Sequence, residues 1–188
     1  MVGMNDLARD KARLLEILRQ DAFIKERVTL SSGKVSDFYI DARRVTLSPE
    51  GVYLCARMIL DMVKNDRLNA IGGPTLGADP IAGAVAFLSF EEKKPINAFI
   101  VRKAPKPYGK QQQIEGPLLK KGDRVALVDD VVTTGKSILQ AMDVLESLGV
   151  QIVKAISIVD RNEGAREALE KRHCPLVSIF AASDFPKS

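Results

Sequence analysis

Two spacing patterns of apolar residues alternate along this chain. Apolar side chains three or four positions apart predict helices over residues 5–20, from 48 onward, through 81–88, from 138 onward and over 163–171. Short apolar runs predict strands over residues 28–30, 38–40, 70–71, 96–101, 125–128, 152–159 and 176–180. Strands that alternate with helices indicate an α/β fold, so we expect a mostly parallel, twisted central sheet flanked by helices, with right-handed crossovers.

The first two predicted helices each have a clear apolar stripe, and the second also has a capping signal. The second is expected to begin with Ser48 as its N-cap and Pro49 in its first turn, because serine caps a helix and proline is tolerated at its start. Their buried stripes are expected to consist of Leu7, Leu14, Ile17 and Leu18 in the first helix and Val52, Ala56, Ile59 and Val63 in the second.

In residues 124–150, a predicted strand and a predicted helix are separated by acidic and hydroxylated residues. Residues 125–128 form an apolar run without alternation, which is typical of a strand covered on both faces. Two carboxylates follow directly, Asp129 and Asp130, and then a turn of small and hydroxylated residues. A helix is predicted next, with its buried face made by Ile138, Met142, Leu145 and Leu148 and its end at Gly149.

This order of strand, acidic pair, polar turn and helix predicts a phosphate site. The first N–H groups of a helix are unpaired and partly positive, and small residues let a phosphate approach them. Carboxylates repel a phosphate, so Asp129 and Asp130 should instead contact sugar hydroxyls or a metal ion shared with the ligand. A nucleotide P-loop is excluded although residues 135–137 read GKS, because Asp130 stands where that motif has its first glycine. An ordinary strand-to-helix turn with two solvated aspartates remains the alternative interpretation.

Composition narrows the class of protein. The 188 residues fit one domain, with 46% hydrophobic and 28% charged residues and a formal net charge of +4. We expect no membrane-spanning segment and no apolar signal core. The small charge excess indicates an anionic small ligand at least as readily as nucleic acid. Cys55 and Cys174 lack metal-ligand spacing and are expected to be reduced and buried in a cytoplasmic protein. One histidine, His173, argues against Ser/His or histidine-rich metal chemistry.

Residues 102–116, RKAPKPYGKQQQIEG, are a long stretch without periodicity. Prolines and a glycine prevent a regular element, and four cations precede the first acid, Glu115. A mobile basic loop could close over an anionic ligand, stabilise its charge and exclude water. A solvated run of charges is the alternative.

The run VALVDDVVTTGKS resembles the phosphoribosyl-diphosphate (PRPP) binding motif of the type I phosphoribosyltransferases. The resemblance implies that Asp129 and Asp130 act as catalytic residues that hold the ribose hydroxyls. It also implies that the rest of the motif binds PRPP, with the 5′-phosphate seated in the turn, through Val131, Val132, Thr133, Thr134, Gly135, Lys136 and Ser137.

The run RKAPKPYG, followed by IEG, is similar to the catalytic loop of the orotate phosphoribosyltransferases, whose usual form is R-K-x-x-K-x-H-G. The match implies that Arg102, Lys103 and Lys106 contact pyrophosphate and that Lys106 is catalytic. In that family a loop lysine reaches into the neighbouring subunit's site, which implies a homodimer. Tyr108 stands at the family's histidine and keeps a positional role in PRPP binding, because a phenol can hydrogen-bond but cannot carry a positive charge.

Residues 32–41, SGKVSDFYID, resemble the segment that lies against orotate in this family. By that match Tyr39 and Ile40 face the base, with Lys34 and Arg43 near it, although a plain edge hairpin is the alternative. The family's D-R element places Arg161 on the orotate carboxylate, and a surface Asp160–Arg161 ion pair is the alternative there. Thr133 is a further expected orotate contact.

Residues 73–78, GPTLGA, match the family's pyrophosphate loop in their Gly-Pro start. Many relatives carry a lysine at the position of Gly77, and many have another at the position of Ser31. The contact at residue 77 is therefore expected to be made by the backbone alone or to be compensated from elsewhere.

Together these features predict a type I phosphoribosyltransferase-like α/β domain over residues 1–188, with a small hood over about 1–45 and a flexible loop over 102–116. The expected reaction joins orotate to PRPP, with Mg²⁺ held mainly by substrate oxygens and water and by no direct protein ligand. We expect no nucleic-acid or membrane partner. Two alternatives are a phosphoribosyltransferase for another base, and a non-catalytic regulatory protein of the same fold.

Overall fold

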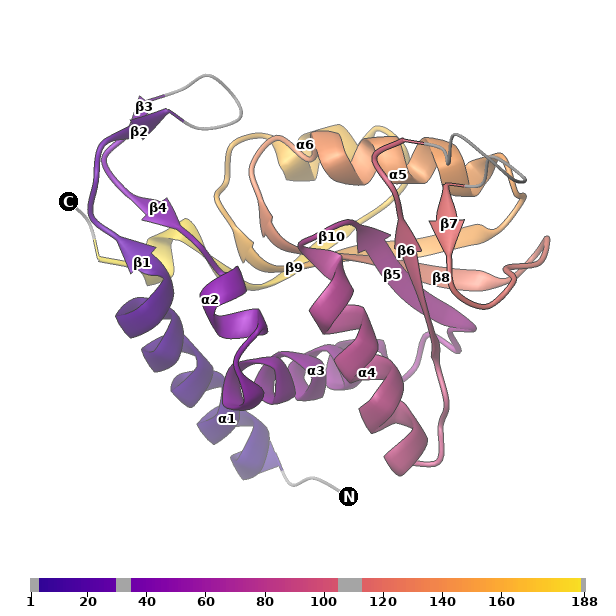
Figure 1. The fold of residues 1–188 in the computed structure, drawn as a ribbon, viewed down its shortest axis with the longest axis horizontal. Helices are drawn as coiled ribbons and strands as arrows, with labels where there is room; N and C mark the ends of the chain where they lie inside the picture. Colours follow the sequence, from indigo (N-terminus) through magenta and orange to yellow (C-terminus); the bar gives the residue numbers. More distant parts are fainter. Residues whose placement is uncertain (1–3, 30–34, 105–112, 187–188) are drawn as a thin grey trace.

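A twisted sheet, mostly parallel, lies at the centre of the molecule (Figure 1). In the computed structural model, which describes residues 4–29, 35–104 and 113–186, this sheet has six strands in the order β10-β9-β8-β5-β6-β7. The pairs within it are parallel except β6 with β7, which is antiparallel. The strands are β5 (Ala70–Pro74), β6 (Asn97–Val101), β7 (Ile114–Glu115), β8 (Arg124–Val132), β9 (Gln151–Asp160) and β10 (Leu176–Ala181). The predicted α/β sheet is confirmed.

Helices cover both faces of the sheet, as the unbroken apolar run of β8 predicts. On one face, Val125 and Leu127 pack with α5 (Lys136–Glu146) and α6 (Ala165–Glu170). On the other, Ala126 and Val128 join the cluster of α1 (Met4–Ile17), α3 (Pro49–Val63) and α4 (Ala78–Glu91). Figure 1 shows α5 and α6 on one side of the sheet and α3 and α4 on the other.

The chain reverses its direction of travel across the sheet between β5 and β8. From β5 it moves outward to β6, and after β7 it returns to pair β8 with the opposite side of β5. The segments that follow β5 and β8 lead to α4 and α5, which lie on opposite faces. Such a switch point leaves a crevice at the carboxyl ends of the two strands, where α/β proteins usually bind ligands.

Strand β8 is longer than predicted and runs on to Val132, so the prediction that it ends before the acidic pair is wrong. Its pairing with β9 continues from Asp129 opposite Ser157 to Val132 opposite Asp160. Asp129 and Asp130 therefore lie within the strand, because the neighbouring strand supplies backbone partners that a sequence pattern does not reveal.

The predicted N-cap of α3 is confirmed, whereas α5 ends at Glu146, before the predicted stop at Gly149. Ser48 accepts a 3.2 Å hydrogen bond from the backbone N–H of Gly51 and caps α3. Val52 is only half-buried in α3, whereas the other three predicted positions of that stripe are buried. The prediction is wrong at Leu148, which lies beyond the end of α5 and is 43% exposed. The helix predicted from residue 163 begins later, at Ala165 after Gly164.

The N-terminal segment packs beside the carboxyl ends of the sheet. Helix α1 continues as a π-helical turn, η1 (Leu18–Ala22), and α2 (Arg43–Thr46) is a short helix that the sequence pattern does not predict. The predicted strands at 28–30 and 38–40 pair with other partners: β4 (Tyr39–Ile40) pairs with β1 (Phe23–Ile24), and β2 (Val28–Thr29) pairs with β3 (Val35–Ser36).

An aromatic stack joins this segment to the C-terminal end of the chain. The ring of Phe23 stacks on Phe38 at 5.5 Å and on Phe185 at 6.1 Å between ring centroids. Phe185 directly follows the short turn η2 (Ala182–Asp184). Among the described residues, no helix has the length and apolar character needed to cross a membrane.

Candidate functional site

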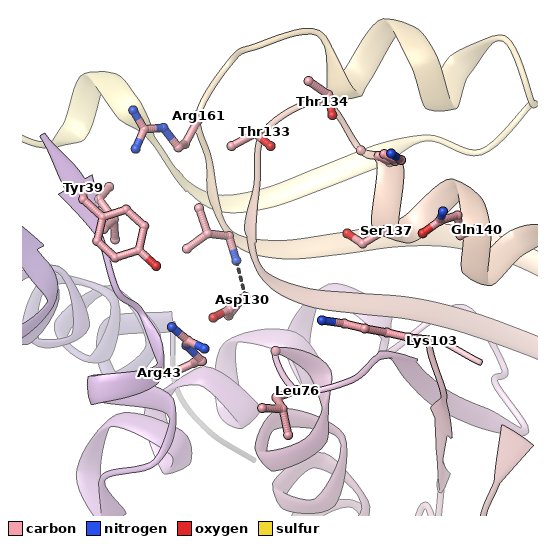
Figure 2. A pocket seen from close by; sticks show the side chains of 15 residues that line it. Tyr39, Arg43, Leu76, Lys103, Asp130, Thr133, Thr134, Ser137, Gln140 and Arg161 are labelled. Atoms are coloured by element: carbon pink, nitrogen blue, oxygen red, sulfur yellow. Dashed lines mark hydrogen bonds between the residues drawn. The ribbon is translucent and has the colours of Figure 1, made fainter. Parts of the chain in front are cut away.

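A cavity of about 530 Å³ opens at the carboxyl ends of β5 and β8 (Figure 2). Five parts of the chain contribute to it: the N-terminal segment, the loop after β5, the segment after β6, the region from β8 into α5, and the segment after β9. The lining residues are Tyr39, Ile40, Arg43, Leu76, Gly77, Lys103, Asp130, Val131, Thr133, Thr134, Gly135, Lys136, Ser137, Gln140 and Arg161. Most of the residues that the sequence motifs single out therefore meet in one place.

The turn from β8 into α5 forms one wall of the cavity. Gly135 has a positive φ of +77°, a conformation that glycine adopts without strain, and α5 begins at the next residue. Thr133, Thr134 and Ser137 line the cavity beside this helix start. Gln140 lines it as well, and the sequence analysis missed this residue although it lies three positions after Ser137, on the same helix face.

The two carboxylates of β8 have different surroundings. Asp130 lines the cavity, and its Oδ1 accepts a 2.8 Å hydrogen bond from the backbone N–H of Val131. Asp129 is only 6% exposed, and its oxygens accept hydrogen bonds from the Asp130 N–H and the Ser137 hydroxyl, both at 3.0 Å. Asp130 thus faces the ligand space, whereas Asp129 lies beneath the turn and holds its parts together.

Burial also changes the acidity of both groups. Removal from water raises the pKa of Asp129 well above its ordinary value, and the charge of Asp130 raises it further. Burial raises the pKa of Asp130 as well, while the Val131 N–H and the positive charge of Arg43 oppose that rise. The pair therefore binds protons more readily than two solvated aspartates would.

The loop after β5 closely approaches this acidic pair. A Cβ atom on Gly77 would lie 2.3 Å from Oδ1 of Asp129 and 2.5 Å from Oδ1 of Asp130. These separations are far below van der Waals contact, so only glycine fits here unless the carboxylates move. The loop also contains a cis peptide bond between Thr75 and Leu76.

The opposite wall of the cavity is aromatic and cationic. Tyr39 and Ile40 of β4 lie there with Arg161, which follows β9 and is 7% exposed. The Arg161 guanidinium donates to Oε1 of Glu163 at 3.0 Å and lies 4.5 Å from the centroid of the Phe38 ring. Its neighbour Asp160 pairs instead with Arg166 at 3.3 Å. The arginine is therefore part of the cavity wall, and the surface-pair alternative does not describe it.

Three of the predicted PRPP contacts, Asp129, Val132 and Arg102, lie outside the cavity lining. The side chain of Val132 is buried in the core with α5, and its carbonyl accepts the Arg161 N–H at 2.9 Å. Arg102 ends the β6 segment and pairs with Glu115 at 3.3 Å, whereas its neighbour Lys103 lines the cavity. Lys106 and Tyr108 fall outside the described residues, as do Ser31 and Lys34.

The side chains of the cavity limit how a metal ion could be bound. Within the described ranges, the chain contains no group of three or more His, Cys, Asp or Glu side chains placed to hold a metal ion. The cavity does offer the Asp130 carboxylate, a hard oxygen ligand of the kind that Mg²⁺ accepts directly or through water. Such a site fits a metal that a ligand brings with its own phosphate oxygens.

Comparisons with known proteins agree with this geometry. The phosphoribosyl transferase domain family matches residues 55–182. An orotate phosphoribosyltransferase of Aquifex aeolicus is 45% identical over 185 residues, which cover 98% of each chain. The chain belongs to the orotate phosphoribosyltransferase family.

Solved members of the family share the fold. The Mycobacterium tuberculosis orotate phosphoribosyltransferase in complex with Fe(III) dicitrate is 38% identical, with a TM-score of 0.82 over 93% of this chain and 98% of that chain. The same enzyme in complex with PRPP is 36% identical, with a TM-score of 0.77 over the same shares. The family match includes the loop after β5, all of β8 and Arg161, and the longer alignment to the Aquifex protein adds Tyr39 and Ile40.

Proposed function

We propose that this orotate phosphoribosyltransferase transfers the ribose 5-phosphate group of PRPP to orotate and releases orotidine 5′-monophosphate and pyrophosphate. In this pentosyl transfer the bond from the sugar carbon to the diphosphate oxygen breaks, and its electron pair leaves with pyrophosphate. A ring nitrogen of orotate gives up its proton to the released pyrophosphate or to water and forms the new bond to that carbon. This reaction is a step of pyrimidine nucleotide synthesis.

One observation carries the proposal: Asp130, the hydroxylated turn at 133–137 and the buried Arg161 line a single cavity. The turn at 133–137 offers hydroxyls and the first N–H groups of α5 to the 5′-phosphate. Asp130 accepts hydrogen bonds from the ribose hydroxyls, and Asp129 supports it from below. The sugar is thereby held with its reacting carbon toward the wall that contains Arg161.

Orotate binds against that wall in this proposal. Its carboxylate pairs with the Arg161 guanidinium, which can present two parallel N–H groups to two oxygens. Tyr39 and Ile40 contact the ring, and Thr133, the first residue of the turn, contacts both substrates. A base without the carboxylate would leave Arg161 without that anion, which favours orotate over uracil or the purines.

The departing pyrophosphate is held by cations at the other end of the cavity. Lys103 lines this end, and we assign Arg102, Lys106 and Tyr108 to the same ligand through the loop over 102–116. Charge that develops on the leaving group is stabilised by such groups more strongly than the ground state is. Asp130 would hold the water shell of a bound Mg²⁺, and the metal would supply positive charge against the diphosphate.

We propose that the enzyme works as a homodimer with this loop shared between subunits. Exposed apolar side chains support a subunit contact: Phe87 and Phe90, near the C-terminal end of α4, are 66% and 70% exposed. Leu47, Leu76 and Pro80 line an adjoining cavity that shares Arg43 with the site. Sedimentation equilibrium should give twice the chain mass of 20.6 kDa, and a single-chain mass would contradict the proposal.

The remaining assignments concern organisation and location. We treat residues 1–188 as one catalytic domain in which about 1–45 form a hood over the base. A cytoplasmic location is consistent with Cys55 and Cys174, which are buried free thiols.

The test of the reaction is an absorbance assay with PRPP and Mg²⁺. Orotate, uracil, hypoxanthine and adenine are offered in turn at equal concentration. We expect consumption of orotate alone, with pyrophosphate formed in equal amount. Consumption of another base in preference to orotate would overturn the proposed function.

A further inference from the structure

Arg43 has a position that the reaction outlined above leaves unused. It begins α2, lines the main cavity, and also lines the adjoining cavity next to Leu76. Figure 2 shows its guanidinium at the edge of the cavity below Asp130, between Tyr39 and Leu76. Among the described residues, its head group hydrogen-bonds only to Asp41, through Nε to Oδ1 at 3.0 Å. The two terminal nitrogens therefore remain available to a ligand.

The loop after β5 cannot supply a cation of its own. Its residues from Gly73 to Ala78 contain no lysine or arginine. A side chain at Gly77 would meet both carboxylates of β8 at less than 3 Å, so a lysine there would displace the acidic pair. The Thr75 hydroxyl is already engaged, because it donates to Oδ2 of Asp79 at 2.7 Å. This loop therefore offers a diphosphate only backbone groups.

The other cations of the cavity are placed for other parts of the ligand. Lys136 stands at the start of α5 near the phosphate turn, and Arg161 lies on the wall with Phe38. Arg43 and Lys103 remain, and in Figure 2 they lie on opposite sides of Asp130 and Leu76. The charge of Arg43 reaches Asp130, where it opposes the effect of burial on the pKa of that carboxyl.

We infer that Arg43 binds the diphosphate of PRPP from the side opposite Lys103, and supplies the positive charge that the loop at Gly77 lacks. Asp41 fixes the guanidinium by its Nε edge, and the two Nη groups then face the phosphoryl oxygens as a fork. The inference rests on the proposed function, because it takes PRPP as the ligand.

The test compares Arg43→Gln with Arg43→Lys and with Arg44→Gln as the matched control. Arg44 follows Arg43 directly, lies 3.8 Å from the other oxygen of Asp41, and lines only the adjoining cavity. Binding of PRPP, inorganic pyrophosphate and orotate is measured by calorimetry with Mg²⁺, and KM is measured for both substrates. Thermal melting of every variant establishes that it is folded.

Arg43→Gln should weaken PRPP and pyrophosphate binding about tenfold or more, and leave orotate binding within about twofold, because one charged hydrogen-bond donor is lost. Arg43→Lys should lose less, since it keeps the charge but not the fork. Arg44→Gln should match the wild type. Unchanged PRPP binding in a folded Arg43→Gln protein, or a loss confined to orotate, would overturn the inference. A wild-type protein that does not consume orotate with PRPP would instead overturn the proposed function.

Discussion

The hydroxyl of Ser137 donates a 3.0 Å hydrogen bond to Oδ2 of Asp129, and so ties the first turn of α5 to the end of β8. The same carboxylate accepts the N–H of Asp130 through its other oxygen. Asp129 therefore links the start of α5, to which we assign the 5′-phosphate, to Asp130, to which we assign the ribose. The relative position of these two groups depends on one buried carboxylate.

Ser137→Ala should loosen this link. The substitution leaves Oδ2 of Asp129 without a partner in a buried place, which costs about 1–3 kcal/mol of folding free energy. It also removes a hydroxyl from the phosphate turn, so KM for PRPP should rise several-fold. Urea unfolding and steady-state kinetics measure both. Ser147→Ala, at the exposed end of the same helix, is the control and should change stability by less than about 0.5 kcal/mol. Equal effects of the two substitutions would contradict the assigned role.

Asp129→Asn should change how stability depends on pH. Burial and the charge of Asp130 raise the pKa of Asp129, so the folded chain holds this proton more tightly than the unfolded chain. That contribution is fully present below the ordinary pKa of an aspartate and is lost as pH rises through the raised pKa of the folded state. An asparagine does not ionise, so the variant should gain stability relative to the wild type as pH rises from 4 to 8.

Urea unfolding of both proteins across that pH range measures the difference. A difference between their unfolding free energies that stays constant, or that shrinks with rising pH, would show that Asp129 is not held in this way. Because Asp129 supports Asp130, turnover of Asp129→Asn should be reduced at every pH.

The site was predictable from sequence where its chemistry is local. The segment from β8 into α5 carries its apolar run, its acids and its turn within some twenty residues, so a pattern alone identifies it. Arg161 is indicated by the family's D-R element, and it reaches the same cavity because it follows β9 and the carboxyl ends of parallel strands share an edge. These residues come together because the sheet is parallel.

Other features of the site depend on contacts between segments that are distant in sequence. The burial of Asp129, the exposure of Asp130 and the requirement for glycine at residue 77 arise where the loop after β5 meets β8, about fifty residues further along the chain. The pairing of β4 with β1 depends on packing around Phe23 and Phe38, which no short motif encodes. The predicted end of β8 was wrong for a related reason: its pairing with β9 continues beyond the apolar run, to Val132.

Gly77→Ala tests the close approach of the loop to the acids. The backbone of Gly77 has φ of −61° and ψ of −41°, which suits alanine, so only the clash with the two carboxylates should matter. Displacement of Asp130 should lower kcat/KM for PRPP at least about tenfold, and crowding should reduce stability by about 1–3 kcal/mol. Gly83→Ala in α4, where a Cβ meets open space, is the control and should be neutral or stabilising by up to about 1 kcal/mol. A fully active Gly77→Ala enzyme would contradict the geometry.

Arg161→Gln should act mainly on orotate. Loss of a charged, forked hydrogen-bond donor predicts a rise in KM for orotate of about 10- to 100-fold, with KM for PRPP changed far less. Glu163→Gln is the matched control, since it removes the ion-pair partner of Arg161 but keeps the guanidinium. A comparable loss in both variants would mean that the ion pair, rather than contact with the substrate, is what matters. Steady-state kinetics with each substrate varied in turn measure these effects.

Lys106→Ala should lower turnover much more than binding, because a loop cation aimed at the leaving pyrophosphate acts chiefly in the transition state. We expect kcat to fall about 100-fold or more while the Kd of PRPP changes only a few-fold. Lys110→Ala in the same loop is the control and should retain most of the activity. Losses of equal size in kcat and in PRPP affinity would show that Lys106 binds the ground state equally well.

We expect the start of α5 to capture the 5′-phosphate of the activated sugar while Asp130 holds the ribose. A crystal structure of the enzyme with PRPP and Mg²⁺ tests this arrangement. The 5′-phosphate should lie within hydrogen-bonding distance of residues 133–137, with the ribose hydroxyls on Asp130. Electron density for that phosphate in any other part of the cavity would rule the arrangement out.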